Sequence, residues 1–264
     1  MRYDNAEHFK KETGHKVNGA WYPRVTKILE IKSKPALQAF FKEVGSFAAA
    51  EDIKNKSAEE GTLIHATIQG VLSGRPTEIP DSVKASVLAV LKFNEQKKMN
   101  LHEGFIERPV WSARHRYSGT VDALATIDGK FGVLDIKTST GFYPEYNLQT
   151  SAYVSALQEF EIKKLFGLTK SPETRWILRV DQQKKCQTCG STLREKGGRL
   201  KIRSNWKSSG PKCFKDNHQW GEMAGEVELR EFPYIYKDFR AFVAAKILWE
   251  WENDYWLKQI GYLK

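Results

Sequence analysis

The sequence predicts a mixed α/β fold with a helical front end. Three observations support this: helical patterns fill most of the first hundred residues, an Asp-Gly turn signal sits between two apolar strand patterns near residue 128, and two further strand patterns occur at 174–181 and 225–232. A helical pattern separates the turn from these later strands, and another ends the chain. Helices that alternate with strands in this way are typical of a sheet covered by helices.

Each front-end element carries a local signal. Residues 20–32 predict an extended entry followed by a helix start near Pro23. Ser57 with Glu60 three residues later predicts a capping box that begins a separate helix over 57–74. The other predicted elements are a helix over 35–56, a helix over 81–98 capped by Asp81, a strand over 104–113, a helix over 143–160 with Pro144 in its first turn, and a carboxy-terminal helix.

The composition favours a folded, reduced protein with a polyanionic partner. The 264 residues are 41% hydrophobic, and 42 Lys+Arg against 32 Asp+Glu give a net charge of +10. Such a charge favours nucleic acid first and an acidic membrane surface second. Three cysteines exclude a disulfide framework, and the sequence shows neither a secretion signal nor an apolar run of membrane-spanning length. We therefore expect an intracellular, cytoplasmic protein without a membrane partner, in an oligomeric state that the sequence leaves open.

The segment 118–138, SGTVDALATIDGKFGVLDIKT, predicts a hairpin turning at Asp128-Gly129. Paired residues would then have numbers that sum to 257, which places Asp122 opposite Asp135. Lys137 would share a face with Asp135, because side chains two apart in a strand point the same way. Facing carboxylates repel, and burying them among apolar residues costs several kcal/mol unless a cation is present. A surface hairpin with a salt bridge is the alternative; a hard divalent metal, Mg²⁺ or Mn²⁺, explains the pair better.

Together with motifs elsewhere, this hairpin resembles the PD-(D/E)xK nuclease superfamily. Four motifs occur in the order seen in its RecB-like exonuclease branch, which is similar to mitochondrial genome maintenance exonuclease-like and CRISPR-adaptation-type nucleases. They are Gly61 with His65, Gly119 with Asp122, Asp135 with Lys137, and Gln149 with Tyr153. The resemblance covers about residues 20–160. Val121 replaces the usual Pro and Asp135 the usual Glu, and both changes are common in that branch.

The resemblance implies a restriction-endonuclease-like core and metal-dependent hydrolysis of DNA. His65, Asp122, Asp135 and the backbone carbonyl of Ile136 would hold one or two Mg²⁺ or Mn²⁺ ions, with Glu107 as a further candidate. Lys137 would orient water or stabilise charge on phosphorus. Gln149 and Tyr153, one turn apart on a helix, would face Lys137 or DNA, although an ordinary amphipathic face explains them too. An exonuclease acting on DNA ends or single strands is expected.

The segment 182–221 predicts a small zinc-ribbon-like insertion in a core formed by 1–181 and 222–264. Cys186 and Cys189 are followed by Cys213 and His218, a spacing suited to tetrahedral structural Zn²⁺. Free surface thiols in a loop are the alternative. Three cysteines in one insertion make the four-cysteine iron–sulfur cluster of some RecB-like relatives a poor fit.

The same insertion holds most of the net positive charge. It contains ten Lys or Arg and only two acidic residues. Its Trp206 and Trp220 could stack on bases. We expect this module to strengthen DNA binding rather than take part in hydrolysis. The predicted nucleic-acid contacts are Lys184, Lys185, Arg199, Lys201, Arg203 and Lys207.

Two other functions remain open from the sequence. A decayed core could leave a binding protein that works through its basic zinc module, but Asp122, Asp135 and Lys137 are all present. The nuclease could also be directed at RNA.

Overall fold

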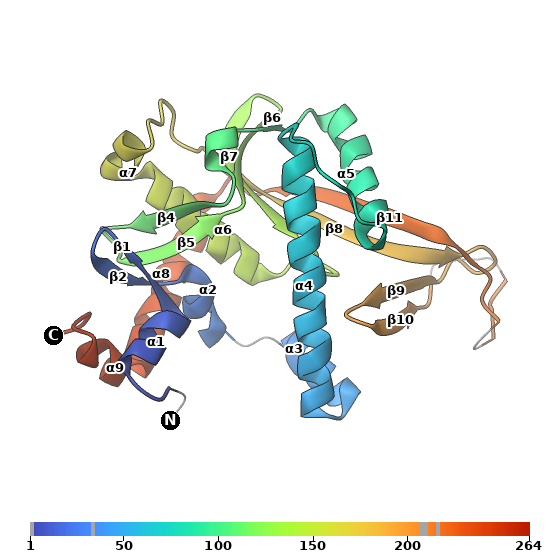
Figure 1. Cartoon of the computed structure of the whole chain (residues 1–264), viewed down its shortest axis with the longest axis horizontal. Helices are drawn as coiled ribbons and strands as arrows, with labels where there is room; N and C mark the ends of the chain where they lie inside the picture. Colours follow the sequence, from blue (N-terminus) through green and yellow to red (C-terminus); the bar gives the residue numbers. More distant parts are fainter. Residues whose placement is uncertain (1–2, 33–34, 206–210, 215–216) are drawn as a thin grey trace.

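The computed structural model describes residues 3–32, 35–205, 211–214 and 217–264, and within these a mixed sheet is flanked by helices (Figure 1). The sheet has seven strands, of which six follow the order β10-β9-β8-β7-β6-β3. On β8, β7 and β9 pair with successive parts of one edge, and β11 pairs along the opposite edge. Their bounds are β3 Asn100–Leu101, β6 Ala123–Ile127, β7 Lys130–Lys137, β8 Thr174–Cys186, β9 Thr192–Lys196, β10 Arg199–Arg203 and β11 Trp220–Glu231. Since β7 and β8 run parallel and the other pairs antiparallel, the predicted α/β class with a mixed sheet is confirmed.

Two short sheets and the helices complete the described fold. The remaining strands are β1 Gly14–Val17, β2 Ala20–Pro23, β4 Arg108–Ser112 and β5 Tyr117–Val121. The α-helices are α1 Ala6–Thr13, α2 Val25–Ile28, α3 Pro35–Val44, α4 Phe47–Leu72, α5 Lys84–Lys97, α6 Pro144–Gln158, α7 Phe160–Leu165, α8 Ile235–Glu252 and α9 Asp254–Gln259. Short 3₁₀ turns lie at Leu29–Ile31, Asp81–Val83 and Glu103–Phe105. No helix in these described ranges is long and apolar enough to cross a membrane.

Alternation along β7 divides the apolar core between the two faces of the sheet. Val133 joins a cluster with residues of α6 and α8, whereas Leu134 and Ile136 join a second cluster with residues of α4 and α5. Side chains that alternate in this way are expected for a central strand covered by helices on both sides. Asp135 and Lys137 therefore share the face covered by α6.

The predicted helix boundaries in the front end are partly wrong. The helix expected over 35–56 breaks at Gly45, whose φ is +71°, and α4 begins after Ser46, whose Oγ accepts a hydrogen bond from the Ala49 N–H. Ser57 lies inside α4 and donates its hydroxyl to the Ile53 carbonyl instead of capping a helix. The break occurs here because Gly45 adopts a positive φ and the next residue, Ser46, can cap α4.

Other boundaries shift for similar local reasons. Asp81 opens a 3₁₀ turn before α5 rather than capping it. Pro144 begins α6 as predicted. The carboxy-terminal helix divides into α8 and α9 at Asn253.

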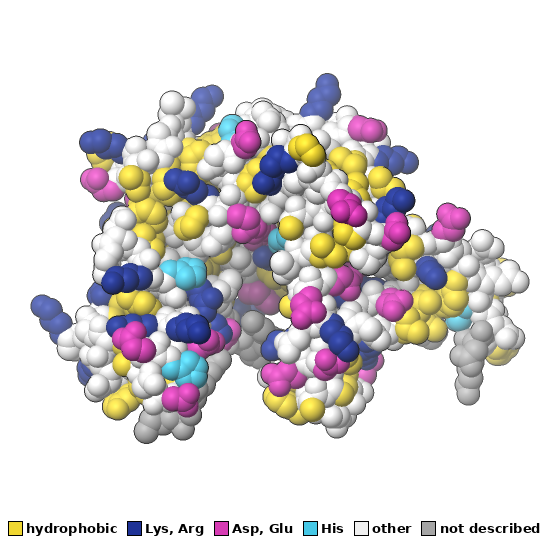
Figure 2. Space-filling view, viewed as in Figure 1, with side chains coloured by type: hydrophobic (Ala, Val, Ile, Leu, Met, Phe, Trp, Pro, Cys, Tyr) yellow, Lys and Arg dark blue, Asp and Glu magenta, His cyan; other side chains and the backbone are white. Residues whose placement is uncertain are grey.

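The basic insertion grows directly out of the central sheet. Strands β8 and β11 both extend beyond the predicted bounds, and they pair from Trp176–Glu231 as far as Cys186–Trp220. Between them, β9 and β10 form a hairpin that lies beside α4 in Figure 1. The surface is hollowed between the part that contains α1 and α2 and the arm formed by α3 and the lower part of α4, with charged side chains of both signs around it (Figure 2).

Candidate metal-dependent nuclease site

The central turn has the predicted conformation and register. Asp128 and Gly129 have φ values of +50° and +80°, as a type I′ turn requires. Ile127 pairs with Lys130 and Thr126 with Phe131, so the sum of 257 is confirmed from Ala123 onward. The first strand is nevertheless interrupted at Asp122, because β5 pairs with β4 and only β6 continues the hairpin.

This interruption lets the Asp122 carboxylate turn towards the end of β7. Its Oδ2 accepts a hydrogen bond of 2.7 Å from the Ile136 N–H. Burial raises the pKa of Asp122 to about 6, although Lys137 and the Ile136 N–H oppose this shift. A bend in the chain, rather than direct strand pairing, brings this carboxylate to the predicted place.

Asp135 and Lys137 form a buried ion pair on the α6 face. The Lys137 Nζ lies 3.0 Å from Asp135 Oδ1 and 2.9 Å from Oδ2, and Asp135 is 1% exposed. Burial raises the pKa of Asp135 to about 6 against the lowering effect of Lys137. Burial also opposes the charge of Lys137, but the two aspartates hold the lysine pKa above its ordinary value.

A second cluster combines His65, Glu107 and Asp122. One potential ligand atom from each lies within 4.8 Å of the others. The Nδ1 of His65 is 3.6 Å from Asp122 Oδ2, and burial followed by the charge of Lys137 lowers the His65 pKa to about 4. The imidazole is therefore neutral at pH 7 and able to bind a metal. Asp135 lies outside this triplet and is paired with Lys137.

Gln69 supports the triplet and was not identified from the sequence. Its Nε2 donates to Glu107 Oε1 at 2.7 Å and to the Asp122 carbonyl at 3.2 Å. Gln69 lies one turn after His65 on α4, so the same four-residue spacing that singles out His65 with Gly61 would have indicated it. Gln69, Ala66 and Glu107 also line a cavity of about 540 Å³ beside the cluster.

Gln149 and Tyr153 contact each other on α6, as their spacing predicts. The Gln149 Nε2 donates to the Tyr153 hydroxyl at 3.1 Å. Tyr153 is 2% exposed, and its burial raises its pKa above the ordinary value. A Cβ on Gly119 would lie 2.4 Å from Tyr153 Cε1, so this glycine makes room for the ring. Tyr153 thus packs behind the carboxylates rather than at the surface.

Two further groups surround Lys137. Its Nζ lies 5.1 Å from the centre of the Tyr146 ring, which the sequence did not single out. The next residue along the chain, Thr138, contacts α4, where a Cβ on Gly61 would lie 2.9 Å from Thr138 Oγ1. Gly61 therefore permits a close approach between α4 and the residue that follows β7.

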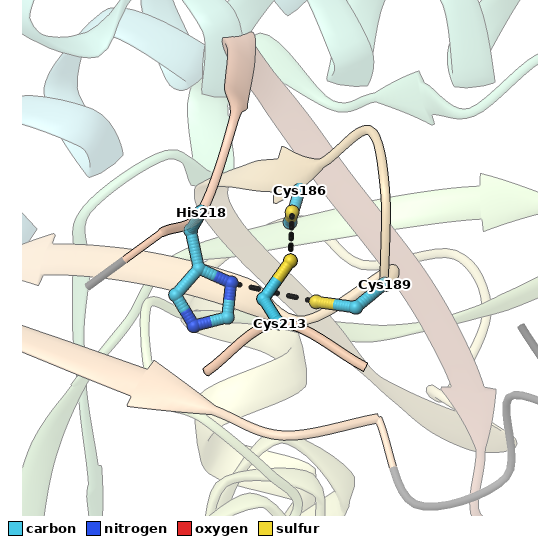
Figure 3. Close-up of side chains that lie close together, drawn as sticks. All are labelled: Cys186, Cys189, Cys213 and His218. Atoms are coloured by element: carbon cyan, nitrogen blue, oxygen red, sulfur yellow. Dashed lines mark hydrogen bonds between the residues drawn. The ribbon is translucent and has the colours of Figure 1, made fainter. Parts of the chain in front are cut away.

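The four predicted zinc ligands come together at the far end of β8 (Figure 3). Cys186 Sγ lies 3.8 Å from Cys213 Sγ, and Cys189 Sγ lies 3.4 Å from His218 Nδ1. Ligands about 2.3 Å from a tetrahedral zinc would be separated by roughly 3.5–3.8 Å. The two separations are close to this range, and the Cys186–Cys213 sulfur distance is too long for a disulfide.

Backbone amides favour the thiolate form of Cys186, whereas burial and the neighbouring thiols raise the pKa of Cys213 to about 11. The N–H groups of Cys189 and Thr188 lower the Cys186 pKa to about 5, a direction that favours metal binding. Gly190, at φ +70°, returns its N–H to the Cys186 carbonyl at 3.0 Å. Trp220 stacks on the His218 ring at 4.6 Å, so it caps this small cluster rather than projecting for bases.

Some of the predicted nucleic-acid contacts are exposed, and others form ion pairs within the protein. Lys185 and Arg203 are exposed and Lys184 is half-buried. Arg199 and Lys201 lie 2.5 and 3.2 Å from the Glu43 carboxylate on α3. Lys207, like Trp206, lies outside the described residues. Arg194 and Lys196, which the sequence did not distinguish within the basic segment, reach the Thr138 carbonyl next to Lys137.

No protein-family model matches the chain, and no curated protein matches it with significant sequence similarity.

Proposed function

We propose that this protein is a metal-dependent DNA nuclease of the RecB-like PD-(D/E)xK type. The observation that carries the proposal is the meeting of His65, Glu107 and Asp122 next to the buried Asp135–Lys137 pair. A neutral imidazole, several carboxylates and an adjacent ammonium are the groups that hydrolysis of a phosphodiester needs. A restriction-endonuclease-like core is part of the same proposal.

The residues fit a divalent cation. Asp122 and Asp135 are both largely buried carboxylates, and Lys137, whose Nζ lies 2.9 Å from Asp135 Oδ2, is the ammonium beside them. Two buried carboxylates beside one ammonium leave negative charge that a divalent cation would offset. Oxygen-rich ligands with one imidazole suit Mg²⁺ or Mn²⁺. His65, Asp122 and Asp135 would hold the ion, with Glu107 and the Ile136 carbonyl as further ligands.

The chain's own residues have separate roles in this mechanism. A bound Mg²⁺ or Mn²⁺ supplies Lewis-acid activation of water and offsets phosphate charge. Lys137, fixed between Asp135 and the Tyr146 ring, points a permanent positive charge at the same place and stabilises charge that develops on the phosphate. Gln69 orients Glu107 through a hydrogen bond of 2.7 Å, and Gln149 holds the buried Tyr153 hydroxyl.

The proposal also includes one structural Zn²⁺, held by Cys186, Cys189, Cys213 and His218. The fit of their separations to a tetrahedron supports it, together with the lowered Cys186 pKa.

One experiment tests the activity, the substrate and the metal together. The protein is incubated with end-labelled single-stranded DNA, duplex DNA and RNA, each with Mg²⁺, Mn²⁺ or EDTA. We expect cleavage of DNA with metal and none with EDTA, beginning at ends or in single strands. Cleavage of RNA alone would redirect the proposal to an RNA nuclease. Tight DNA binding without cleavage under every metal condition would favour the non-catalytic binding protein instead.

A further inference from the structure

The β9–β10 hairpin collects its cations on one face. Lys196 pairs with Arg199, and Arg194 pairs with Lys201. Directly paired residues point to the same side, as do residues two apart, so these four side chains and Arg203 share one face of the hairpin. The opposite face carries Leu200, Ile202 and Glu195. Like charges placed so close destabilise a hairpin, which suggests that this face meets negative groups.

Contacts show that the cationic face of β9–β10 is turned inward. Arg194 donates to the Thr138 carbonyl at 3.2 Å, and Lys196 donates to the same oxygen. Arg199 and Lys201 meet Glu43 of α3, and Arg199 also lies over the Phe40 ring at 5.2 Å. The face therefore borders the space between α3, α4 and the end of β7, where Asp135 and Lys137 lie.

The hairpin tip is held tightly on α4. A Cβ on Gly197 would lie 2.4 Å from the Ile53 carbonyl and 2.3 Å from Ser57 Oγ, and the Gly197 N–H donates to Glu60 Oε2 at 3.3 Å. Ile53, Ser57, Gly61 and His65 follow each other at four-residue steps along one stripe of the helix. Each step is about 6 Å, so this stripe links the tip to the metal-binding histidine in three turns.

Of the two cations that reach the Thr138 carbonyl, Lys196 is the one that forms no ion pair with a carboxylate within the described residues. Arg194 is committed to Asp181, whose carboxylate it reaches at 2.6 and 2.8 Å. Within the described residues, Lys196 gives one hydrogen bond, to Thr138, and an ammonium has three donors. Lys196 is half-buried, and its Nζ donates to the carbonyl of Thr138, the residue that follows Lys137.

We propose that the inward cationic face of β9–β10, led by Lys196, binds the phosphate backbone of the substrate beside the bond that is cut. The basic insertion then forms a wall of the nuclease site instead of only adding affinity at a distance. This inference rests on the proposed nuclease function for the nature of the ligand. Because Lys196 meets the residue that follows Lys137, the backbone it holds is aligned with the metal ligands.

The test compares Lys196→Met and Lys196→Arg with a charge-matched control, Lys170→Met, at an exposed lysine in the loop after α7. Binding of a labelled single-stranded oligodeoxynucleotide is measured without Mg²⁺ or Mn²⁺ over a range of salt, and cleavage is measured with Mn²⁺. Loss of one phosphate contact should weaken binding about 10-fold. It should also reduce the slope of log affinity against log salt by about 0.7. Arginine should restore both, and the control should match the wild type.

Wild-type affinity and salt slope in folded Lys196→Met would overturn the inference, whatever the cleavage rate. If that variant does not fold, Arg203→Gln at the exposed, open end of the same face replaces it, and an unchanged slope there would overturn the inference equally. A wild-type protein that binds DNA but never cleaves it would refute the nuclease proposal, while the binding data would still decide the role of the hairpin.

Discussion

Lys137 illustrates how residue-level chemistry is set by its neighbours. Two aspartates hold its charge, Tyr146 covers it on one side, and α4 approaches Thr138 on another. The sequence supplies the charged residues, but their spacing alone leaves open how far each is buried. Burial is what raises the pKa of Asp122 and Asp135 and lowers that of His65.

Replacing either member of the central ion pair should abolish cleavage. We expect Lys137→Met and Asp135→Asn to lower kcat by about 10³-fold or more, since each removes charge at the reacting phosphate. DNA binding should stay within a few-fold, because the basic insertion is intact. Lys130→Met, at the exposed start of the same strand, is the control. Nuclease activity retained by Asp135→Asn would contradict the assignment.

The metal-free protein should lose stability as its buried aspartates ionise. A carboxyl with a folded pKa near 6 and an ordinary unfolded pKa holds its proton more tightly when folded, so its contribution falls as pH rises from about 4 to 6. Without Mg²⁺ or Mn²⁺, Asp122→Asn should therefore be more stable than the wild type at pH 7.5, by about 1–2 kcal/mol, and this gain should shrink at pH 5.

Urea unfolding at the two pH values measures this difference. Adding Mn²⁺ should stabilise the wild type at pH 7.5 but much less at pH 5, and it should not stabilise Asp122→Asn. An equal gain from Mn²⁺ in the variant would exclude Asp122 as a ligand.

At the scale of elements, glycines decide how closely the helices approach the sheet. Gly61 and Gly119 stand at the first positions of two sequence motifs, and each makes room for a partner from another element. The sequence predicted the start of α6 from Pro144 and the hairpin register from Asp-Gly, both local signals. It misplaced the start of α4 because Ser57–Glu60 imitates a cap inside a helix.

Gly119→Ala should destabilise the protein and reduce activity. Its new methyl would overlap the buried Tyr153 ring, and overpacking of this kind costs about 1–3 kcal/mol. Melting temperatures measured by circular dichroism would check this. Gly104→Ala is the matched control, because its Cβ would meet open space at an ordinary φ. An unchanged melting temperature for Gly119→Ala would show that Tyr153 moves freely.

At the scale of the whole molecule, two candidate metal clusters lie at different points along β8, because Asp135 pairs with Ile177 near the start of this strand and Cys186 is its last residue. The carboxylate cluster sits near the end of β7, and the sulfur cluster sits where β8 and β11 leave the core. The β9–β10 hairpin lies between them: β9 begins three residues after Cys189, and the tip of the hairpin at Gly197 packs against α4.

The two metals should therefore be separable by substitution. Elemental analysis should find about one zinc per chain, lost in Cys189→Ser but kept in Asp122→Asn. Stabilisation by Mn²⁺ should show the reverse pattern. Zinc retained by Cys189→Ser at wild-type occupancy would argue against a four-ligand structural site.

The sequence by itself determined the turn, the register and the α/β class, because backbone conformation and side-chain alternation are local properties. The spacing of the four zinc-ligand candidates was also readable along the chain. Only the tertiary structure placed Gln69 against Glu107, Tyr146 beside Lys137 and Lys196 on the Thr138 carbonyl, since these residues come from separate elements brought together by packing. It likewise turned the basic hairpin inward, a direction that depends on contacts with α3, α4 and Thr138 rather than on charge.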